Sequence, residues 1–157
     1  MSELKPVDIF DAFEEIMQYA HYWNWRPDWQ VAKEIYRSFP NSYSVLTPFA
    51  YTYLEELVRS TTSEYGIEIY DNNGNPKKRK VGLGLIKLAI EENKEDKPDY
   101  VSTLEEMKKY FYPSRRSDEG ENRNSVVHGY MHPRYWSDES FEKLVLDLAK
   151  ISKYAGF

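Results

Sequence analysis

Residues 122–133, NRNSVVHGYMHP, bring together side chains that can move protons and bind anions. The stretch holds two of the three histidines of the chain, His128 and His132, together with Arg123 and two asparagines. Imidazole titrates near neutral pH and can act as a general acid or base. Guanidinium carries a fixed fork of donors that matches phosphate oxygens. The stretch is therefore the first place to look for a chemical site.

The spacing within this stretch is also specific. Arg123 and His128 are separated by four residues, with Asn124 directly after the arginine and Gly129 directly after the histidine. This resembles the HEPN superfamily, helical bundles marked by an arginine, four to six further residues beginning with Asn, Asp or His, and a histidine. The motif lies late in the chain, before a final helix, as in that family. The resemblance covers in principle the whole bundle and implies a metal-independent endoribonuclease of the toxin or antiviral-defence type, without a cofactor.

The residue types suit that chemistry. RNA supplies its own nucleophile, the 2′-hydroxyl, so a catalyst needs a proton acceptor, a proton donor and a cation for the charged phosphorane. His128 can serve as the acid or base, and Arg123 can stabilise the charge on the phosphate. Asn124 can orient His128 or the phosphate, since residues four apart share a helix face. We take Arg123, Asn124 and His128 as the predicted catalytic residues.

The two main residues do not converge on a regular helix. Positions 123 and 128 differ by about 140° around an ideal helix, so Arg123 must sit at the unwound start of the helix or a partner must complete the site. The family resemblance implies the second solution, because HEPN proteins commonly pair two motifs across a dimer interface. We therefore expect a homodimer whose two-fold axis brings two arginines and two histidines to one cleft.

Further residues near the motif are candidates for binding RNA. This part of an acidic chain is slightly basic, and aromatic rings in it can stack on bases while cations contact phosphates. The predicted substrate-binding residues are Arg115, Arg116, Tyr130 and Arg134. Packing at an interface is an equally good use for Tyr130, Tyr135 and Trp136. Glu55, Glu56 and Arg59 can face the motif but are typical of a solvent-facing stripe, and we leave them out of the predicted site.

Three other interpretations stay open. Arg123 can be a structural partner of Asp118, Glu119 or Glu121, with His128 a buried core residue. His128 and His132 have the i, i+4 spacing of two metal ligands, although the glutamate of the metalloprotease pattern is missing, and we predict no metal. The chain can also be a HEPN-like dimer without catalysis, a binding or regulatory module. An antitoxin or regulatory protein is a possible partner in either case.

Composition limits the class of protein. The 157 residues, with 41% apolar and 16% aromatic side chains, are enough for a single globular domain over residues 1–157. The absence of cysteine excludes disulfides and thiolate chemistry and fits a reducing compartment. The sequence contains no run long enough for a membrane span, so we expect a cytoplasmic protein. A net charge of −5 disfavours broad electrostatic binding of nucleic acid and leaves room for a local basic site.

Hydrophobic periodicity predicts an all-α fold, an antiparallel helical bundle of six or seven amphipathic helices. Apolar residues recur with helical spacing in the ranges 9–20, 29–39, 47–66, 83–93, 102–111 and 137–156. Thr47, a Ser102–Glu105 capping box and Ser137 are the predicted starts of the third, fifth and last of these helices.

The exception to the helical pattern lies around residues 67–81, where we expect an exposed loop or one short hairpin turning at Asn73-Gly74. Within it, PKKRKV at 76–81 resembles a nuclear localisation signal, because four consecutive cations suit an acidic receptor. A solvated basic turn explains the same residues.

Overall fold

The computed structural model describes residues 8–66, 70–112, 121–123, 126 and 136–157. These residues form the all-α fold that the sequence predicts. The helices are α1 (Ile9–Tyr19), α2 (Arg26–Ser38), α3 (Tyr43–Ser60), α4 (Gly82–Asn93), α5 (Pro98–Met107) and α7 (Asp138–Ile151), with short 3₁₀ helices at Pro40–Ser42, Lys108–Phe111 and Ser152–Tyr154. Among the described helices, none combines the length and the apolar character that a membrane crossing requires.

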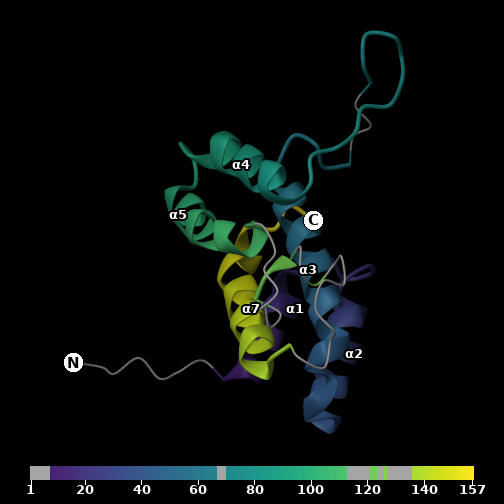
Figure 1. Ribbon diagram of the computed structural model, residues 1–157, viewed down its shortest axis with the longest axis vertical. Helices are drawn as coiled ribbons and strands as arrows, with labels where there is room; N and C mark the ends of the chain where they lie inside the picture. Colours follow the sequence, from purple (N-terminus) through teal and green to yellow (C-terminus); the bar gives the residue numbers. More distant parts are fainter. Residues whose placement is uncertain (1–7, 67–69, 113–120, 124–125, 127–135) are drawn as a thin grey trace, which may run out of the picture.

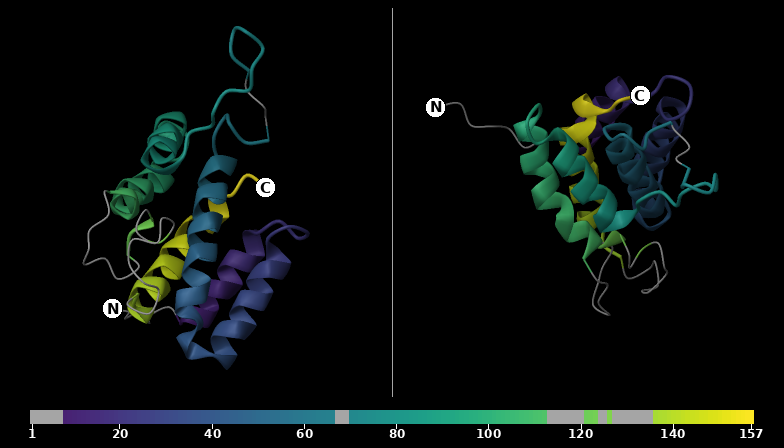
Figure 2. Two further views of the ribbon diagram at one scale, coloured as in Figure 1. Left: turned by 45° about the vertical axis from the view of Figure 1, so that its right-hand side comes forward. Right: turned by 90° about the horizontal axis from the view of Figure 1, so that it is seen from above.

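The helices form a bundle with a helical hairpin across one end. Figures 1 and 2 show α1, α2 and α3 running in alternate directions, with α7 filling the bundle beside α1 and α3. The antiparallel pair α4 and α5 packs on the C-terminal half of α3 and on α7. Connected helices are antiparallel in each of these pairs, as expected for short connections.

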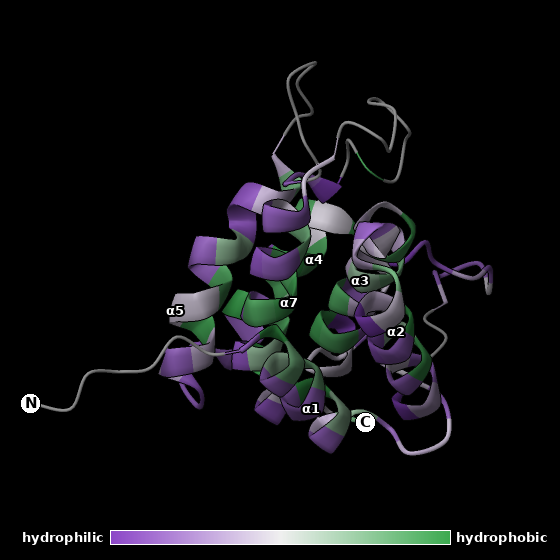
Figure 3. Cartoon of the chain, turned by 90° about the horizontal axis from the view of Figure 1, so that it is seen from below, coloured by the Kyte–Doolittle hydropathy of each residue, from purple (hydrophilic) through white to green (hydrophobic). Residues whose placement is uncertain are grey.

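The core is built from the apolar faces that the periodicity predicts. Figure 3 shows hydrophobic positions turned toward the interior and polar positions outward. Aromatic rings dominate the contact between the first helices: Trp29 is fully buried, and its ring lies 5.8 Å from that of Phe13 and 5.1 Å from that of Tyr53. Edge-to-face contacts of this kind add about 0.5–1.5 kcal/mol each beyond the burial of area. The packing of these rings holds α3 against α2, and α3 is the helix that also carries Glu55.

The predicted start of α3 is wrong. Thr47 does not cap the helix, which begins at Tyr43 directly after the 3₁₀ turn and contains Pro48 in its second turn. Proline there removes one intrahelical hydrogen bond. The helix continues because Leu46 and Ala50 on either side are buried in the core, and the Thr47 hydroxyl instead donates to the carbonyl of Tyr43 at 2.6 Å.

Three other predicted boundaries shift for similar reasons. The prediction that Ser102 and Glu105 cap the start of a helix is wrong. Helix α5 begins at Pro98, four residues before Ser102, and this earlier start buries Tyr100. Proline suits the first turn of a helix. The third helix ends at Ser60 rather than at Gly66, which instead has a φ of +69° in the turns that follow. The last helix ends at Ile151 and is continued by a 3₁₀ turn.

The start of α7 is confirmed. The hydroxyl of Ser137 accepts a hydrogen bond of 3.0 Å from the backbone N–H of Ser140, with Asp138 and Glu139 in the first turn. A hydroxyl acceptor and early acidic residues stabilise a helix N-terminus.

The segment expected as a loop or hairpin at 67–81 has one antiparallel bridge, between Tyr70 and Pro76, and no strand in its described part, residues 70–81. Asp71 builds the turn: its carboxylate accepts hydrogen bonds from the backbone of Asn73 and Asn75 at 2.8 and 3.0 Å. Gly74 supplies the left-handed conformation, with a φ of +78°.

Candidate functional site

Arg123 is the predicted site residue that the structure describes. The other two predicted catalytic residues, Asn124 and His128, lie outside the described residues, as do the predicted substrate-binding residues Arg115, Arg116, Tyr130 and Arg134. The geometry between the arginine and the histidine therefore stays a prediction. What the structure adds is the environment that holds Arg123.

Arg123 stands at the beginning of a helical turn. Residue 122 is not helical, whereas Arg123 and Val126 are, and the carbonyl of Asn122 accepts a 3.1 Å hydrogen bond from the N–H of Val126. Both neighbours are anchored: Val126 is buried, and the buried side-chain amide of Asn122 donates to the carbonyl of Tyr112 at 2.6 Å. Arg123 is thus the first helical residue of this turn, and its relation to a residue five positions later stays a prediction.

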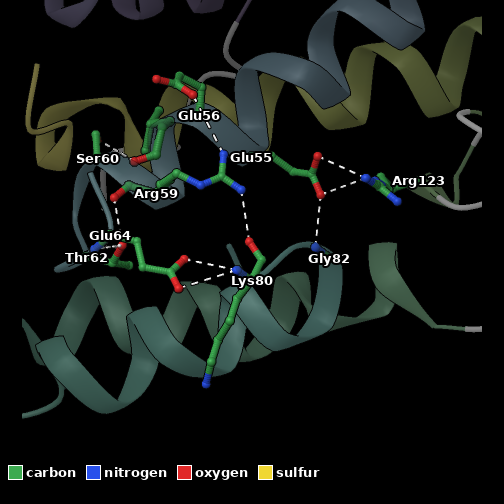
Figure 4. A network of polar contacts seen from close by, with 10 residues as sticks. Glu55, Glu56, Arg59, Ser60, Thr62, Glu64, Lys80, Gly82 and Arg123 are labelled. Atoms are coloured by element: carbon green, nitrogen blue, oxygen red, sulfur yellow. Dashed lines mark hydrogen bonds and ion pairs between the residues drawn. The ribbon is translucent and has the colours of Figure 1, made fainter. Parts of the chain in front are cut away.

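The guanidinium of Arg123 is held by a carboxylate from α3. Its Nη2 lies 2.9 Å from Oε1 of Glu55 and donates to Oε2 at 3.0 Å. The Arg123 and Glu55 side chains are 13% and 16% exposed, so water screens this ion pair less than it screens a surface pair. Both contacts are made by the same nitrogen, which differs from the two-nitrogen fork of a bidentate arginine–carboxylate pair. Figure 4 shows the two side chains pointing toward each other from separate parts of the fold.

Glu55 also holds the beginning of α4. Its Oε1 accepts a 3.0 Å hydrogen bond from the backbone N–H of Gly82, the first residue of that helix. The first N–H groups of a helix lack intrahelical partners and favour negative charge nearby. Gly82 has a φ of +58°, a conformation that glycine adopts without strain. One carboxylate thus fixes both the arginine of the motif and the entry to the helical hairpin.

One turn further along α3, Arg59 holds the chain that leads into α4. It donates to the carbonyl of Lys80 at 2.9 Å, and its Nη1 lies 3.8 Å from Glu56. The buried carboxylate of Glu64 accepts from the N–H of Lys80, with its two oxygens at 3.1 and 3.4 Å. Figure 4 shows these contacts as one network that runs beside the Glu55–Arg123 pair.

The interpretation of Glu55 and Arg59 as part of a solvent-facing stripe is wrong. Their side chains are only 16% and 14% exposed, and each holds a segment more than twenty residues away in sequence. A signal was present: the neighbours Leu54, Leu57 and Val58 are apolar and buried, so little of this part of α3 can face solvent. Glu55 is the functional candidate that the motif alone does not name.

Two aromatic residues near the site are structural. Trp136 is buried in the core, so it packs rather than stacks on bases; Tyr135 lies outside the described residues. The hydroxyl of Tyr110 donates to the carboxylate of Asp147 on α7. Burial and the Asp147 charge raise the pKa of Tyr110 far above its ordinary value, so this phenol stays protonated. The contact anchors the 3₁₀ helix just before Tyr112, which binds Asn122.

The interpretation of His128 and His132 as two metal ligands stays untested, because both residues lie outside the described residues. Elsewhere in the described chain, no group of three or more histidine, cysteine or acidic side chains is arranged to hold a metal ion. Comparison of the chain with protein-family models, with curated proteins and with solved structures finds no match.

Proposed function

We propose that this chain is a HEPN-like, metal-independent endoribonuclease. The observation that carries the proposal is the setting of Arg123: the arginine of the RNSVVH motif is a partly buried guanidinium at the start of a helical turn, fixed by a carboxylate from another helix. The helical bundle is the fold that the resemblance implies. An arginine held in one place is suited to stabilising the charge on a phosphate while one of its P–O ester bonds breaks.

In the proposed reaction the 2′-oxygen attacks the adjacent phosphorus while a histidine removes its proton. The new bond from the 2′-oxygen to phosphorus forms as the bond from phosphorus to the 5′-oxygen breaks, and the leaving 5′-oxygen takes a proton from an acid. In a homodimer the His128 residues of the two copies supply the base and the acid. Arg123 stabilises the charge on the phosphorane, Asn124 orients His128 or the phosphate, and Glu55 positions Arg123.

The biological class follows from the resemblance. The proposed enzyme acts as a toxin or an antiviral-defence nuclease on cellular or invading RNA in the cytoplasm. An antitoxin or regulatory protein would then restrain or trigger it. The predicted substrate-binding residues Arg115, Arg116, Tyr130 and Arg134 would contact RNA around the motif.

A second function is favoured by one observation. Glu55 lies against Arg123 and reduces the positive field that the guanidinium presents to a phosphate, and the chain as a whole carries a charge of −5. A HEPN-like dimer that binds or regulates a protein, without catalysis, makes use of the same fold. The ion pair would then be structural.

The chemistry of the products separates these functions. The nuclease should cleave a defined RNA oligonucleotide in the presence of a chelator and leave a 2′,3′-cyclic phosphate or its 3′-phosphate product. Replacing the 2′-hydroxyl at the mapped cleavage position with hydrogen should stop cleavage there and at no other position. Cleavage that survives this replacement, or that needs an added divalent metal, would rule out the proposed mechanism. Stoichiometric metal bound through His128 and His132 would support the metal interpretation instead.

A further inference from the structure

Residues 70–81 form an arm that projects from the bundle beside the start of α4 (Figure 1). We refer to it as the basic arm, because it carries Lys77, Lys78, Arg79 and Lys80 in succession, all exposed. The whole chain has 21 lysines and arginines against 26 acidic residues. Four adjacent exposed cations are therefore a strong local departure from the charge of the molecule.

The carboxylates of Asp71 and Glu64 contact the backbone of the arm. Asp71 accepts hydrogen bonds from the backbone N–H groups of Asn73 and Asn75 and so shapes the turn. Glu64 accepts from the backbone N–H of Lys80. Within the described part of the chain, the ammonium groups of Lys77, Lys78 and Lys80 take part in no ion pair. Among the described residues, these three ammonium groups are exposed and have no carboxylate partner.

The base of the arm is fixed to the bundle. Both backbone polar groups of Lys80 are bound, the carbonyl by Arg59 and the N–H by Glu64, and Glu64 is only 7% exposed. Figure 4 shows the side chain of Lys80 leading away from this network. The buried carboxylate of Glu64 and the guanidinium of Arg59 thus hold the base of the arm in place, which a solvated turn does not require.

The same network connects the arm to the candidate site. Lys80 is two residues from Gly82, which shares the carboxylate of Glu55 with Arg123. Two residues of chain span at most about 7 Å between Cα atoms. The backbone of the arm therefore ends within about 7 Å of Gly82, whose N–H shares Glu55 with Arg123, so a strand bound along the base of the arm would pass near this part of the candidate site.

We propose that the basic arm binds the phosphate backbone of single-stranded RNA and guides it toward Arg123. The choice of RNA rests on the proposed function, whereas the binding of a polyanion rests on the charge and anchoring of the arm. Lysine and arginine neutralise phosphates without reading sequence, so the arm would contribute affinity rather than specificity.

The test is a binding measurement that does not depend on cleavage. A fluorescent 20-nucleotide RNA with 2′-O-methyl groups throughout cannot be cut by 2′-hydroxyl attack, and its anisotropy reports binding to the full chain. The test variant is Lys77→Gln/Lys78→Gln/Arg79→Gln, which spares Lys80 and its backbone contacts. The matched control is Lys143→Gln/Lys150→Gln/Lys153→Gln, which removes three exposed cations from α7 and the turn after it.

The arm variant should bind the RNA about 10²-fold more weakly than the wild type at 0.1 M salt, because three contacts to single-strand phosphates contribute about −2 to the slope of log K (the association constant) against log salt concentration. The slope measured for the arm variant should therefore be about 2 shallower than that of the wild type. The control variant should match the wild type in both affinity and slope. Equal loss in both variants would mean that only net charge matters, and would overturn the proposal. The proposal would also be overturned if the arm variant binds RNA as the wild type does, while a reporter fused to the protein accumulates in the nucleus only when the arm is intact. The partner of the arm would then be an acidic import receptor. If RNA binding depends on the arm but the protein cleaves no RNA, the result would support the proposed role of the basic arm and reject the proposed nuclease function.

Discussion

Glu55 and Arg123 form a partly buried ion pair, with Nη2 of the arginine 2.9 Å from the carboxylate, although 68 residues separate them in sequence. The same carboxylate binds the first N–H of α4. A single side chain on α3 therefore determines where the arginine of the motif lies and where the helical hairpin begins.

Glu55→Gln should reduce RNA cleavage more than it reduces stability. Glutamine keeps the shape and an acceptor but loses the charge that fixes the guanidinium, and a misplaced group can cost up to about 10²-fold in rate. The expected loss of stability is about 1.5–3 kcal/mol, the usual range for a hydrogen bond to a charged group. Single-turnover cleavage below the unfolding temperature and thermal unfolding measure the two effects separately.

The matched control is Glu56→Gln, the next residue of α3. Its carboxylate is 33% exposed and lies 3.8 Å from Arg59, so the change should alter stability by less than about 1 kcal/mol and leave cleavage intact. If the folded Glu55→Gln protein cleaves as fast as the Glu56→Gln protein, Glu55 does not position Arg123.

Gly82→Ala should destabilise the protein, whereas Gly84→Ala should stabilise it. The φ of +58° at Gly82 costs an alanine about 1–2 kcal/mol, and the nearest atom to an added Cβ, Cδ1 of Phe111, is at an ordinary 3.8 Å, so the strain is in the backbone. Gly84 lies within α4 with open space around a Cβ, and alanine there should gain about 0.5–1 kcal/mol. Denaturant unfolding of the two variants checks both signs. Equal effects would contradict the role of the Gly82 conformation at the start of α4.

Glu142→Gln should stabilise the protein near pH 7.5 and not near pH 3.5. Partial burial, followed by the charges of Asp138, Asp8 and Glu139, raises the pKa of Glu142 in the folded state. A raised pKa means that the contribution of this group to stability is present below the unfolded pKa and is lost as the pH rises through the folded pKa. Glutamine stays neutral and can still accept from the Tyr36 hydroxyl, whose pKa is raised to about 12 by burial and by Glu142.

The gain from Glu142→Gln should be on the order of 0.5 kcal/mol, because solvent screens this partly exposed group. Thermal unfolding of the variant and wild type at both pH values measures it. Glu106→Gln, at an exposed position of α5, serves as the control for the loss of one carboxylate. A gain of equal size at both pH values would argue against a titrating Glu142.

The sequence predicted the helices well and their ends less well. Periodic burial in α7, for example, follows directly from the spacing of Phe141, Leu144 and Leu148, which are all buried. Local capping signals failed at Thr47 and Ser102, because the helices extend toward buried residues that lie before those positions. Packing outweighed the local preference in both cases.

The partner of Arg123 could not be predicted from the motif. The pairing depends on how α3 lies against a segment 68 residues later, and no local pattern encodes that distance. From the sequence we place Glu55 in a solvent-facing stripe; its apolar neighbours Leu54 and Leu57 are a sign of partial burial, but they name no partner. The relation of Arg123 to His128, Asn124 and the basic and aromatic residues around them stays a prediction.

A homodimer should be present at tens of micromolar protein, a concentration above the dissociation constants of ordinary specific interfaces, which are about micromolar or lower. The reason is that one motif supplies a single histidine, whereas the proposed reaction uses a base and an acid. Sedimentation or light scattering gives the mass, and cross-linking should place residues 123–136 at the interface. A strictly monomeric protein that still cleaves RNA would remove the composite site from the mechanism.

The central claim is most directly tested by RNA cleavage with purified wild type beside His128→Ala and Arg123→Lys. Loss of a proton-transfer group typically lowers the rate by ~10²- to 10⁴-fold, so His128→Ala should be nearly silent while folded. Arg123→Lys keeps the charge but loses the planar guanidinium, and should also be strongly impaired. We expect the wild type to cut RNA, to leave DNA untouched and to leave a 2′,3′-cyclic phosphate or its 3′-phosphate product. Equal cutting of RNA by all three proteins would contradict the account. The account would also be contradicted if all three proteins were folded dimers, an activator had been supplied, and none of them cut RNA.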